Sequence, residues 1–455
     1  QLHALMNLAI HPLNLYLELQ SLFARAEQVF VVASVILYSN AIVPLLITQG
    51  ASEGDGVDIL SFNYTPLNLL FLLNYFISAI LLTLRWKSTL HTLIADPFWL
   101  ILTVMIPISL LWSVNPDETT SGSVGMIGTI LFGVYLASRF SLDKQLSLLC
   151  WSYGVMVVFS WIFVVALPKY GVMGGVHAGT LRGVFTHKNG LGKAMVFSTA
   201  LFILQTRRLW SQNRWMWLGI AGSVSLILGS TSGGALINCT MLVLVVLVLQ
   251  VFQFKSKHLI LGLILLAIIL ATFWAWYTDI SIMVLEAIGK DASLTGRGDI
   301  WPYTLVKIME RPWLGYGFNG FWHGANGESI FMIRALRWDV PNSHNGYLDY
   351  ILQLGFLGFI PLCLALWSTF VKGFALLRNR FKWSHAWPIV FLASMIIVNF
   401  TETDLLSQNN RTWIFFTTAV LSTAIEFRER FRISEHSDQD TLPALAQSIS
   451  GSQQS

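Results

Sequence analysis

The sequence predicts an all-α polytopic membrane protein, and its composition and its apolar runs both support this fold class. Of the 455 residues, 55% are hydrophobic and only 11% are charged, whereas about a quarter are charged in an ordinary soluble domain. The apolar residues gather in runs that approach the length of a membrane-spanning helix, about 20 residues. Because every backbone N–H and C=O must be paired inside lipid, such runs favour helices over strands. The composition therefore excludes an ordinary soluble globular protein.

About twelve apolar segments qualify as membrane-spanning helices. They lie at about 28–49, 67–84, 97–113, 123–138, 146–166, 190–206, 215–230, 234–252, 259–277, 346–371, 386–401 and 412–426. Between the seventh and eighth, LGSTSGGAL is compatible with either a tight turn or a broken helix. The expected organisation is a cytoplasmic segment at 1–27, a transmembrane domain at 28–432 and a disordered cytoplasmic tail at 433–455, which is rich in Ser, Gln and Asp.

The distribution of Lys and Arg predicts the orientation, because positive residues in short loops are retained in the cytoplasm. One set of connections carries these residues, and the alternate connections at about 50–66, 114–122 and 402–410 contain none. The alternate set therefore faces outward. The net charge of +4 comes from basic residues scattered between apolar runs, so it indicates topology and gives no support for nucleic-acid binding.

One outward connection, at about 278–345, is much longer than the others, and long loops in compact proteins are usually functional or disordered. This loop contains IWPYTLVKIMERPW, in which apolar residues recur at helical spacing from Ile300 to Trp313. The pattern predicts an amphipathic helix that lies on the membrane surface or caps a cavity.

Three polar clusters fall in outward loops or at outward ends of spans, where they can meet. The clusters are LRGVFTHKNGLGKA with Arg182, His187, Lys188 and Asn189, SLTGRGDIW with Arg297, and NSHNGYLDYILQLGFLG with His344, Asn345 and Asp349.

The residue types in these clusters suit transfer chemistry on a phosphorylated substrate. Two converging arginines, Arg182 and Arg297, would stabilise a diphosphate leaving group, although Arg182 alone also fits an interfacial anchor. His344 is the favoured general base because its ordinary pKa lies near neutrality, and a simple helix cap is the alternative. His187 is the rival base, but neighbouring cations suit it better to phosphate contact. Asp349, if inside the bilayer, should face the protein interior and have a partner.

Other polar and aromatic residues are candidates for sugar binding. The turn FTETDLLSQNNRTW contains Glu402 and either binds sugar hydroxyls or is an ordinary solvated turn. Trp301, Trp313 and Trp322 in the long loop are possible stacking platforms for sugar rings. The sequence has no Walker-type phosphate loop and no paired-histidine zinc motif, so we expect neither a metal nor another cofactor.

At these residues the chain resembles the O-antigen ligase and polysaccharide polymerase family of bacterial envelopes. The matching segments are RGVFTHKNGLG, LTGRGDIWPYTLVKIMERPWLGYGFNGFW and SHNGYLDYILQLGFLG, in the family's order. The resemblance implies a metal-independent inverting glycosyltransferase in the bacterial inner membrane, with its active site facing the periplasm. It also implies an undecaprenyl diphosphate-linked saccharide as donor, with Arg182 and Arg297 on the diphosphate and His344 on the acceptor hydroxyl.

The implied partners are this lipid-linked saccharide, the lipid bilayer and other polysaccharide assembly proteins, with no nucleic acid. The motifs GRGDIW, ERPWLGYG and TETDLLSQNN resemble those of exopolysaccharide polymerases more than those of ligases that act on lipid A core. Two further functions stay open. A secondary transporter of a small anion such as bicarbonate predicts broken helices and charges near the bilayer midplane, and a structural scaffold leaves the Arg and His clusters unexplained.

Overall fold

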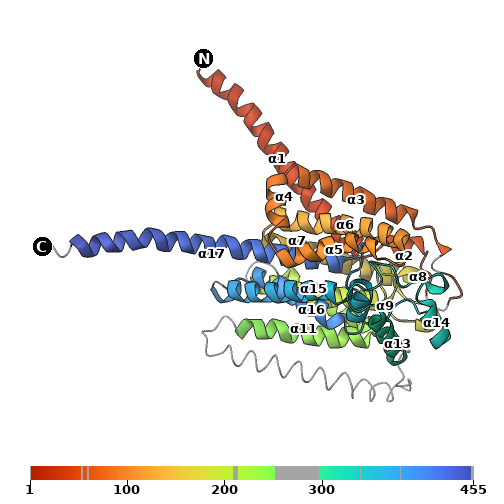
Figure 1. The fold of residues 1–455 in the computed structure, drawn as a ribbon. Coiled ribbons are helices and arrows are strands. Elements are labelled where there is room, and N and C mark those ends of the chain that lie inside the picture. The colour runs from red at the N-terminus through yellow and green to blue at the C-terminus, as the bar shows by residue number, and fades with distance from the viewer. Residues whose placement is uncertain are drawn as a thin grey trace. The chain divides into compact units, whose positions relative to one another are not determined.

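A computed structural model of the chain describes residues 2–52, 55–58, 61–208, 214–251, 297–338, 340–379 and 381–451. Over these residues the chain is helical, and its β-structure is one bridge between Val172 and Leu181. The predicted all-α class is therefore confirmed for the described residues, whose helices are labelled in Figure 1. The predicted span at 259–277 and the start of the long loop, up to residue 296, lie outside them.

The chain forms two compact units, each built from two stretches of sequence. The first unit contains Gln1–Asn74 and Lys144–Leu236, and the second contains Tyr75–Asp143 and Ile237–Ser455. Three helices run from one stretch into another: α3 (Thr65–Thr83), α11 (Gly233–Val251) and α7 (Leu142–Ala166), whose first two residues belong to the second unit.

The remaining helices of the first unit are α1 (Leu2–Tyr38), α2 (Val43–Ile47), α8 (Pro168–Gly171), η3 (Gly175–His177), α9 (Lys188–Arg208) and α10 (Trp215–Ser230). Helices α9 and α10 pack together, and the hydroxyls of Ser198 and Ser223 lie 2.8 Å apart between them. Thr231 adopts a φ of 48° between α10 and α11. LGSTSGGAL therefore interrupts the helix at Thr231 and Ser232, which fits both alternatives, a tight turn or a broken helix.

The second unit contains α4 (Trp86–Leu93), α5 (Pro97–Ile108), η2 (Ser109–Leu111), α6 (Pro116–Arg139), α13 (Arg297–Glu310), η5 (Gly324–Asn326), α14 (Ile330–Leu336), α15 (Gly346–Asn379), α16 (Trp383–Val398) and α17 (Arg411–Gly451). Buried residues from α13, α14 and α15, among them Ile300, Met332 and Leu352, form one apolar core. The helix predicted from Ile300 to Trp313 corresponds to α13, which contributes to this core.

Several apolar helices are long enough to cross a membrane, which identifies a multi-pass membrane protein. Within the described ranges six qualify, or seven if the pair at Trp86–Leu93 and Pro97–Leu111, bent by 95°, is a single span. The six are Glu18–Tyr38, Thr65–Thr83, Pro116–Arg139, Leu142–Ala166, Gly233–Gln250 and Gly346–Asn379. The predicted number of about twelve is not confirmed, although every predicted segment inside the described ranges contains a helix.

Two predicted boundaries differ from the structure. The predicted span at 28–49 is broken after Tyr38, because Asn40 and Ile42 adopt left-handed backbone angles before α2 begins. Helix α17 continues to Gly451, past the point near residue 433 where the sequence predicts disorder. Extending an existing helix costs much less than nucleating one, so polar residues can prolong an apolar helix.

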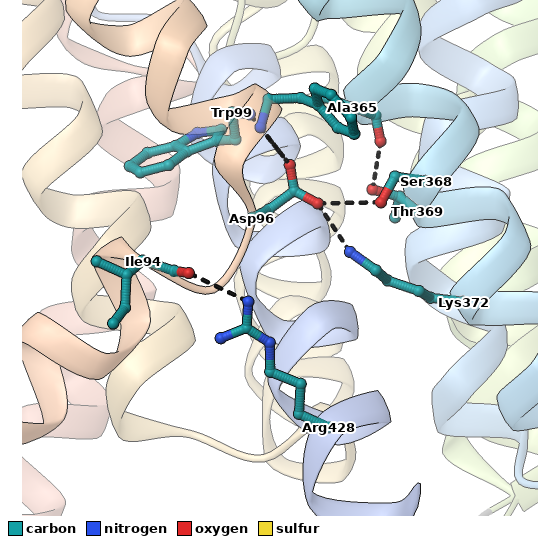
Figure 2. A network of polar contacts seen from close by, with 9 residues as sticks. Ile94, Asp96, Trp99, Ala365, Ser368, Thr369, Lys372 and Arg428 are labelled. Atoms are coloured by element: carbon teal, nitrogen blue, oxygen red, sulfur yellow. Dashed lines mark hydrogen bonds and ion pairs between the residues drawn. The ribbon is translucent and has the colours of Figure 1, made fainter.

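Asp96 connects α5 to α15 in the second unit (Figure 2). Its Oδ1 accepts hydrogen bonds from the N–H groups of Phe98 and Trp99, both at 3.1 Å. Its Oδ2 accepts from Ser368 Oγ at 3.1 Å and pairs with Lys372 Nζ at 2.8 Å. These four contacts satisfy both oxygens of a carboxylate that is fully buried.

Helix α15 is broken at Gly355, where φ is 62° and ψ is −172°. The rings of Tyr347 and Phe359 lie 6.3 Å apart, whereas twelve residues of straight helix would separate their Cα atoms by about 18 Å. Residues 346–354 therefore fold back alongside the residues that follow the break. The predicted span at 346–371 is corrected accordingly, because a glycine with positive φ reverses its direction.

The backbone of the long loop forms hydrogen bonds with the backbone groups on both sides of this break. The N–H groups of Phe356 and Leu357 donate to the carbonyl oxygens of Pro312 and Trp313, at 2.8 and 3.1 Å. The N–H groups of Tyr316 and Gly317 donate to the carbonyl oxygens of Leu352 and Gln353, at 2.9 and 3.0 Å. A Cβ atom at Gly355 would lie 2.2 Å from the Trp313 carbonyl. Irregular backbone in a membrane helix requires such internal partners.

Candidate functional site

Arg182 lies in the first unit, in the loop between α8 and α9. Its side chain is fully buried, and its donors bind protein oxygens of residues 50–52 and of helix α8. Nε donates to the Tyr170 carbonyl at 2.7 Å. The two terminal nitrogens donate, over distances of 2.5 to 3.0 Å, to the carbonyls of Gly50, Ala51 and Lys169 and to Ser52 Oγ. These bonds use all five N–H groups of a guanidinium.

Arg182 therefore ties residues 50–52 to residues 169–170. Burial lowers the pKa of Arg182 from its ordinary value, and the charge of Asp55 opposes that shift. An arginine nevertheless stays protonated near neutral pH, because its ordinary pKa is above about 12. The predicted contact between Arg182 and a diphosphate requires these bonds to be exchanged for phosphate oxygens.

His187, Lys188 and Asn189 lie at the start of α9, close in sequence to Arg182. The Asn189 N–H donates to His187 Nδ1 at 3.2 Å, and Asn189 Oδ1 accepts from Ser232 Oγ at 3.3 Å. The ring of His187 meets that of His177 edge to face, with centroids 5.3 Å apart. All three predicted residues are partly exposed. A cationic helix start with accessible side chains is a suitable place for an anionic group.

His344 lies in the second unit, in a short loop that two tryptophans and Asp349 hold in place. Asp349 Oδ1 accepts from Trp322 Nε1 at 3.1 Å and from the Ser343 N–H at 3.2 Å. Trp301 Nε1 donates to the Ser343 carbonyl at 3.0 Å. Asp349 is buried, so the prediction that it faces the interior with partners is confirmed. Trp301 and Trp322, predicted to stack on sugars, use their N–H groups to fix the His344 loop.

Asn345 and the turn after α16 complete this arrangement. Asn345 Oδ1 caps α15 by accepting from the N–H groups of Tyr347 and Leu348, at 3.0 and 3.2 Å. The Gly346 N–H donates to the carbonyls of Asn399 and Glu402, at 2.8 and 3.0 Å. The structure therefore brings His344, Asn345, Trp301 and the backbone of Glu402 together around one loop.

The backbone of His344 has a φ of 52°, which is uncommon for a residue other than glycine. Its N–H donates to Asn342 Oδ1 at 2.9 Å, and the same oxygen accepts from Thr403 Oγ1 at 3.1 Å. Such conformations persist where the surroundings fix them, and they cluster at functional sites. The partly exposed His344 side chain is therefore carried on a firmly held backbone.

The structure does not test the convergence of all the predicted catalytic residues. Arg182 and His344 belong to different compact units, and the side chain of Arg297, at the start of α13, lies outside the described residues. Their convergence on one substrate stays a prediction. Within the described part of the chain, no group of three or more His, Cys, Asp or Glu residues could hold a metal ion.

Sequence reasoning missed the residues that hold the His344 loop from a distance. Asn342 and Thr403 share a hydrogen bond across 61 residues of sequence. Asn399 is fully buried, and its Oδ1 accepts from the N–H groups of Asp404 and Leu405 at 3.0 and 2.8 Å. The sequence feature that could have indicated this contact is the pair of polar runs, NSHN and TETD, each of which lies next to an apolar segment.

Comparison with known proteins supports the resemblance found in the motifs. Residues 217–363 match the family model described as O-Antigen ligase. The chain is also similar to the exopolysaccharide production protein ExoQ of Rhizobium meliloti (strain 1021), with 20% identity over 323 residues that cover 67% of this chain and 72% of that protein. The matched family region includes Arg297, Trp301, His344 and Asn345. The resemblance to the O-antigen ligase and polysaccharide polymerase family is therefore confirmed.

Proposed function

We propose that this protein is a polysaccharide polymerase of the O-antigen ligase type, which extends a saccharide carried on undecaprenyl diphosphate at the periplasmic face of the bacterial inner membrane. The observation that carries the proposal is the His344 loop. A half-buried histidine lies inside the matched family region, on a backbone fixed by Trp301, Asp349 and Asn342. The similarity to an exopolysaccharide production protein favours a polymerase over a ligase.

In the proposed reaction, His344 takes the proton of an acceptor sugar hydroxyl. The hydroxyl oxygen then forms a bond to the anomeric carbon of the donor sugar, and the bond from that carbon to the diphosphate oxygen breaks. The polyprenyl diphosphate leaves with the bonding electrons. The donor is already activated, so the reaction needs neither ATP nor a nucleotide. A positioned general base contributes roughly a hundredfold to ten-thousandfold in such a step.

Cations are needed where the diphosphate charge develops. Arg297 and Lys188 are the proposed contacts, with His187 and Asn189 near the same headgroup. Arg182 supports this role by fixing the loop that precedes α9, since its donors are bound to protein oxygens. We keep the direct contact between Arg182 and diphosphate as the alternative arrangement.

The test is chain extension in vesicles that contain the purified protein and undecaprenyl diphosphate-linked repeat units. We expect longer saccharides on a gel, and His344→Ala should abolish them while donor binding is retained. His187→Ala should weaken donor binding instead. His91→Ala is a matched control, because His91 is an exposed histidine on α4 that has no role in the proposed reaction. If only His187→Ala loses transfer and keeps donor binding, His187 is the base.

The orientation has its own test, which rests on the alternation of cationic and cation-free loops. Reporter fusions after Gly54 and near Ala325 should both report the periplasmic side. A cytoplasmic signal at either position would contradict the proposed location of the active site.

The broken helix α15 is a feature that the transporter alternative also predicts. However, its freed N–H groups at Phe356 and Leu357 and the carbonyls of Leu352 and Gln353 all bind residues 312–317. These groups are therefore occupied and do not form a free ion site. Uptake of a small anion by the same vesicles, without any lipid-linked saccharide, would favour transport.

A further inference from the structure

The turn between α16 and α17 reaches the middle of two membrane-spanning helices. The Asn409 N–H donates to Thr129 Oγ1 of α6 at 2.9 Å, and the hydroxyl of Tyr75 on α3 donates to Asn409 Oδ1. At 1.5 Å per residue, Thr129 lies about 20 Å from the first residue of α6 and about 15 Å from the last. By the same measure, Tyr75 lies about 15 Å and about 12 Å from the ends of α3. Both contacts therefore lie near the middle of α6 and α3, away from the ends of these helices.

The turn also touches the His344 loop at its other end. The carbonyls of Asn399 and Glu402 accept from the Gly346 N–H, and Thr403 bonds to Asn342. Residues 403–409 thus lead from the candidate site toward the centre of α6. This differs from a solvated outward turn, which was one of the two alternatives for this segment.

The residues at the deep end are polar and partly accessible. Ser407, Gln408, Asn409, Asn410 and Arg411 are all half-buried. Polar groups packed against membrane-spanning helices face the protein interior or water in preference to acyl chains. Their partial exposure leaves polar groups that a substrate can contact.

Gln408 has an unused hydrogen-bonding atom at this position. Its Oε1 is buried and has no hydrogen-bond partner. The side chain lies against α6, since a Cβ atom added to Gly125 would be 2.8 Å from Oε1. A buried polar atom without a partner is uncommon and costs stability. It is consistent with an atom that is kept for a ligand.

The segment is fixed in an unfavourable conformation. Leu406 and Asn409 have φ values of 56° and 54°, and this region is particularly costly for residues other than Gly, Asn and Asp. Asn399 Oδ1 and Thr129 Oγ1 bind the backbone N–H groups that hold this shape. The cost is consistent with a functional placement of Gln408.

We propose that residues 407–411 form the inner subsite for the acceptor saccharide, in which Gln408 Oε1 accepts a hydrogen bond from a sugar hydroxyl. This inference rests on the proposed function and adds a positioning residue to it. The neutral hydroxyl and carboxamides of Ser407, Gln408 and Asn410 suit sugar hydroxyls. A site that binds a hydroxyl through a buried acceptor discriminates strongly against a sugar that lacks it.

The experiment compares Gln408→Met with wild type in the chain-extension assay. Removing one neutral hydrogen bond to the substrate should raise the KM for the acceptor about tenfold and leave kcat nearly unchanged. The melting temperature should stay the same or rise, because an unpaired buried acceptor is removed. Gln145→Met on α7 is the matched control: Gln145 is a buried glutamine of the first unit, and neither acceptor KM nor kcat should change.

A binding measurement separates this inference from the proposed function. The probe is the repeat-unit oligosaccharide released from the donor by mild acid, titrated against tryptophan fluorescence of the full-length protein. Wild type and His344→Ala should bind it equally, and Gln408→Met about tenfold more weakly. Unchanged binding and unchanged KM in Gln408→Met overturn the subsite.

Loss of transfer by wild type with binding intact overturns only the polymerase proposal. If Gln408→Met does not fold, Gln408→Asn withdraws the carboxamide by one methylene and serves in the same two measurements. An oligosaccharide that wild type does not bind also overturns the subsite.

Discussion

Asp96 and Gln408 are two polar side chains inside the second unit, and they differ in how their oxygens are satisfied. Both oxygens of Asp96 are bound, by two N–H groups, a hydroxyl and the Lys372 ammonium (Figure 2). Gln408 Oε1 is buried with no partner. The Asp96 contacts join α5 to α15 without any ligand. Gln408 Oε1, in contrast, would gain a hydrogen-bond partner only when a ligand binds.

The difference teaches how to separate structural polar groups from substrate-binding ones. A saturated group should affect stability when it is removed, because its partners are left buried and unpaired. An unsaturated group should affect binding and leave stability unchanged. By this criterion Arg182, with all five donors bound to protein oxygens, belongs with Asp96.

The largest effect is expected for Arg182→Lys. A lysine cannot reach four carbonyls and a hydroxyl on two segments, so several buried acceptors lose their partners and the free energy of unfolding should fall by about 3–5 kcal/mol. Thermal melting in detergent, followed by tryptophan fluorescence, measures this loss. A variant that melts like wild type but transfers on the order of a hundredfold more slowly would instead place Arg182 on the diphosphate.

Asp96→Ala should have the next largest effect. The substitution removes the cap of α5 and leaves Lys372 without its partner, which should cost about 3 kcal/mol of unfolding free energy. The melting temperature should fall, and the acceptor KM of the remaining folded protein should not change. A change in the acceptor KM without a change in melting temperature would show that Asp96 acts on substrate binding, as proposed for Gln408, and would contradict its structural role.

A smaller loss of about 1 kcal/mol is expected for Lys372→Met. The Lys372 side chain is 22% exposed and Asp96 keeps three of its four hydrogen bonds, so the carboxylate remains largely satisfied. Denaturation of the two single variants and the double variant gives the coupling between Asp96 and Lys372. Equal losses in both single variants would show that the ion pair dominates over the helix cap.

The smallest effect is a pH dependence at Glu310, on α13. Its hydrogen bond with Lys307 lowers the pKa of Glu310 from its ordinary value, against the opposing effect of burial. Because the folded-state pKa is depressed, the stabilisation is present above the ordinary carboxyl pKa of about 4.3 and disappears as the pH falls through the folded value. Glu310→Gln should therefore melt slightly below wild type at pH 7, and the difference should vanish in acid. A difference that persists in acid would assign the effect to packing.

Much of the helical organisation could be predicted from the sequence, and much less of the candidate site. The apolar runs located helices such as α6, α7 and α11, and the NSHN motif correctly placed His344 beside Asn345 at the start of α15. The same hydropathy pattern concealed the break at Gly355, since QLGFLG is apolar on both sides of a glycine whose φ only the structure reveals.

The sequence by itself determined the membrane class, the positions of most helices and the resemblance to a family, because hydropathy, helix length and motif sequences are local properties of the chain. Only the tertiary structure decided that all donors of Arg182 are bound, that residues 312–317 pair with the backbone at the break in α15 and that Gln408 lies against α6. The partners in the first two cases are mainly backbone carbonyls and N–H groups. Nearly every residue supplies both groups, so no side-chain pattern identifies in advance which of them will meet.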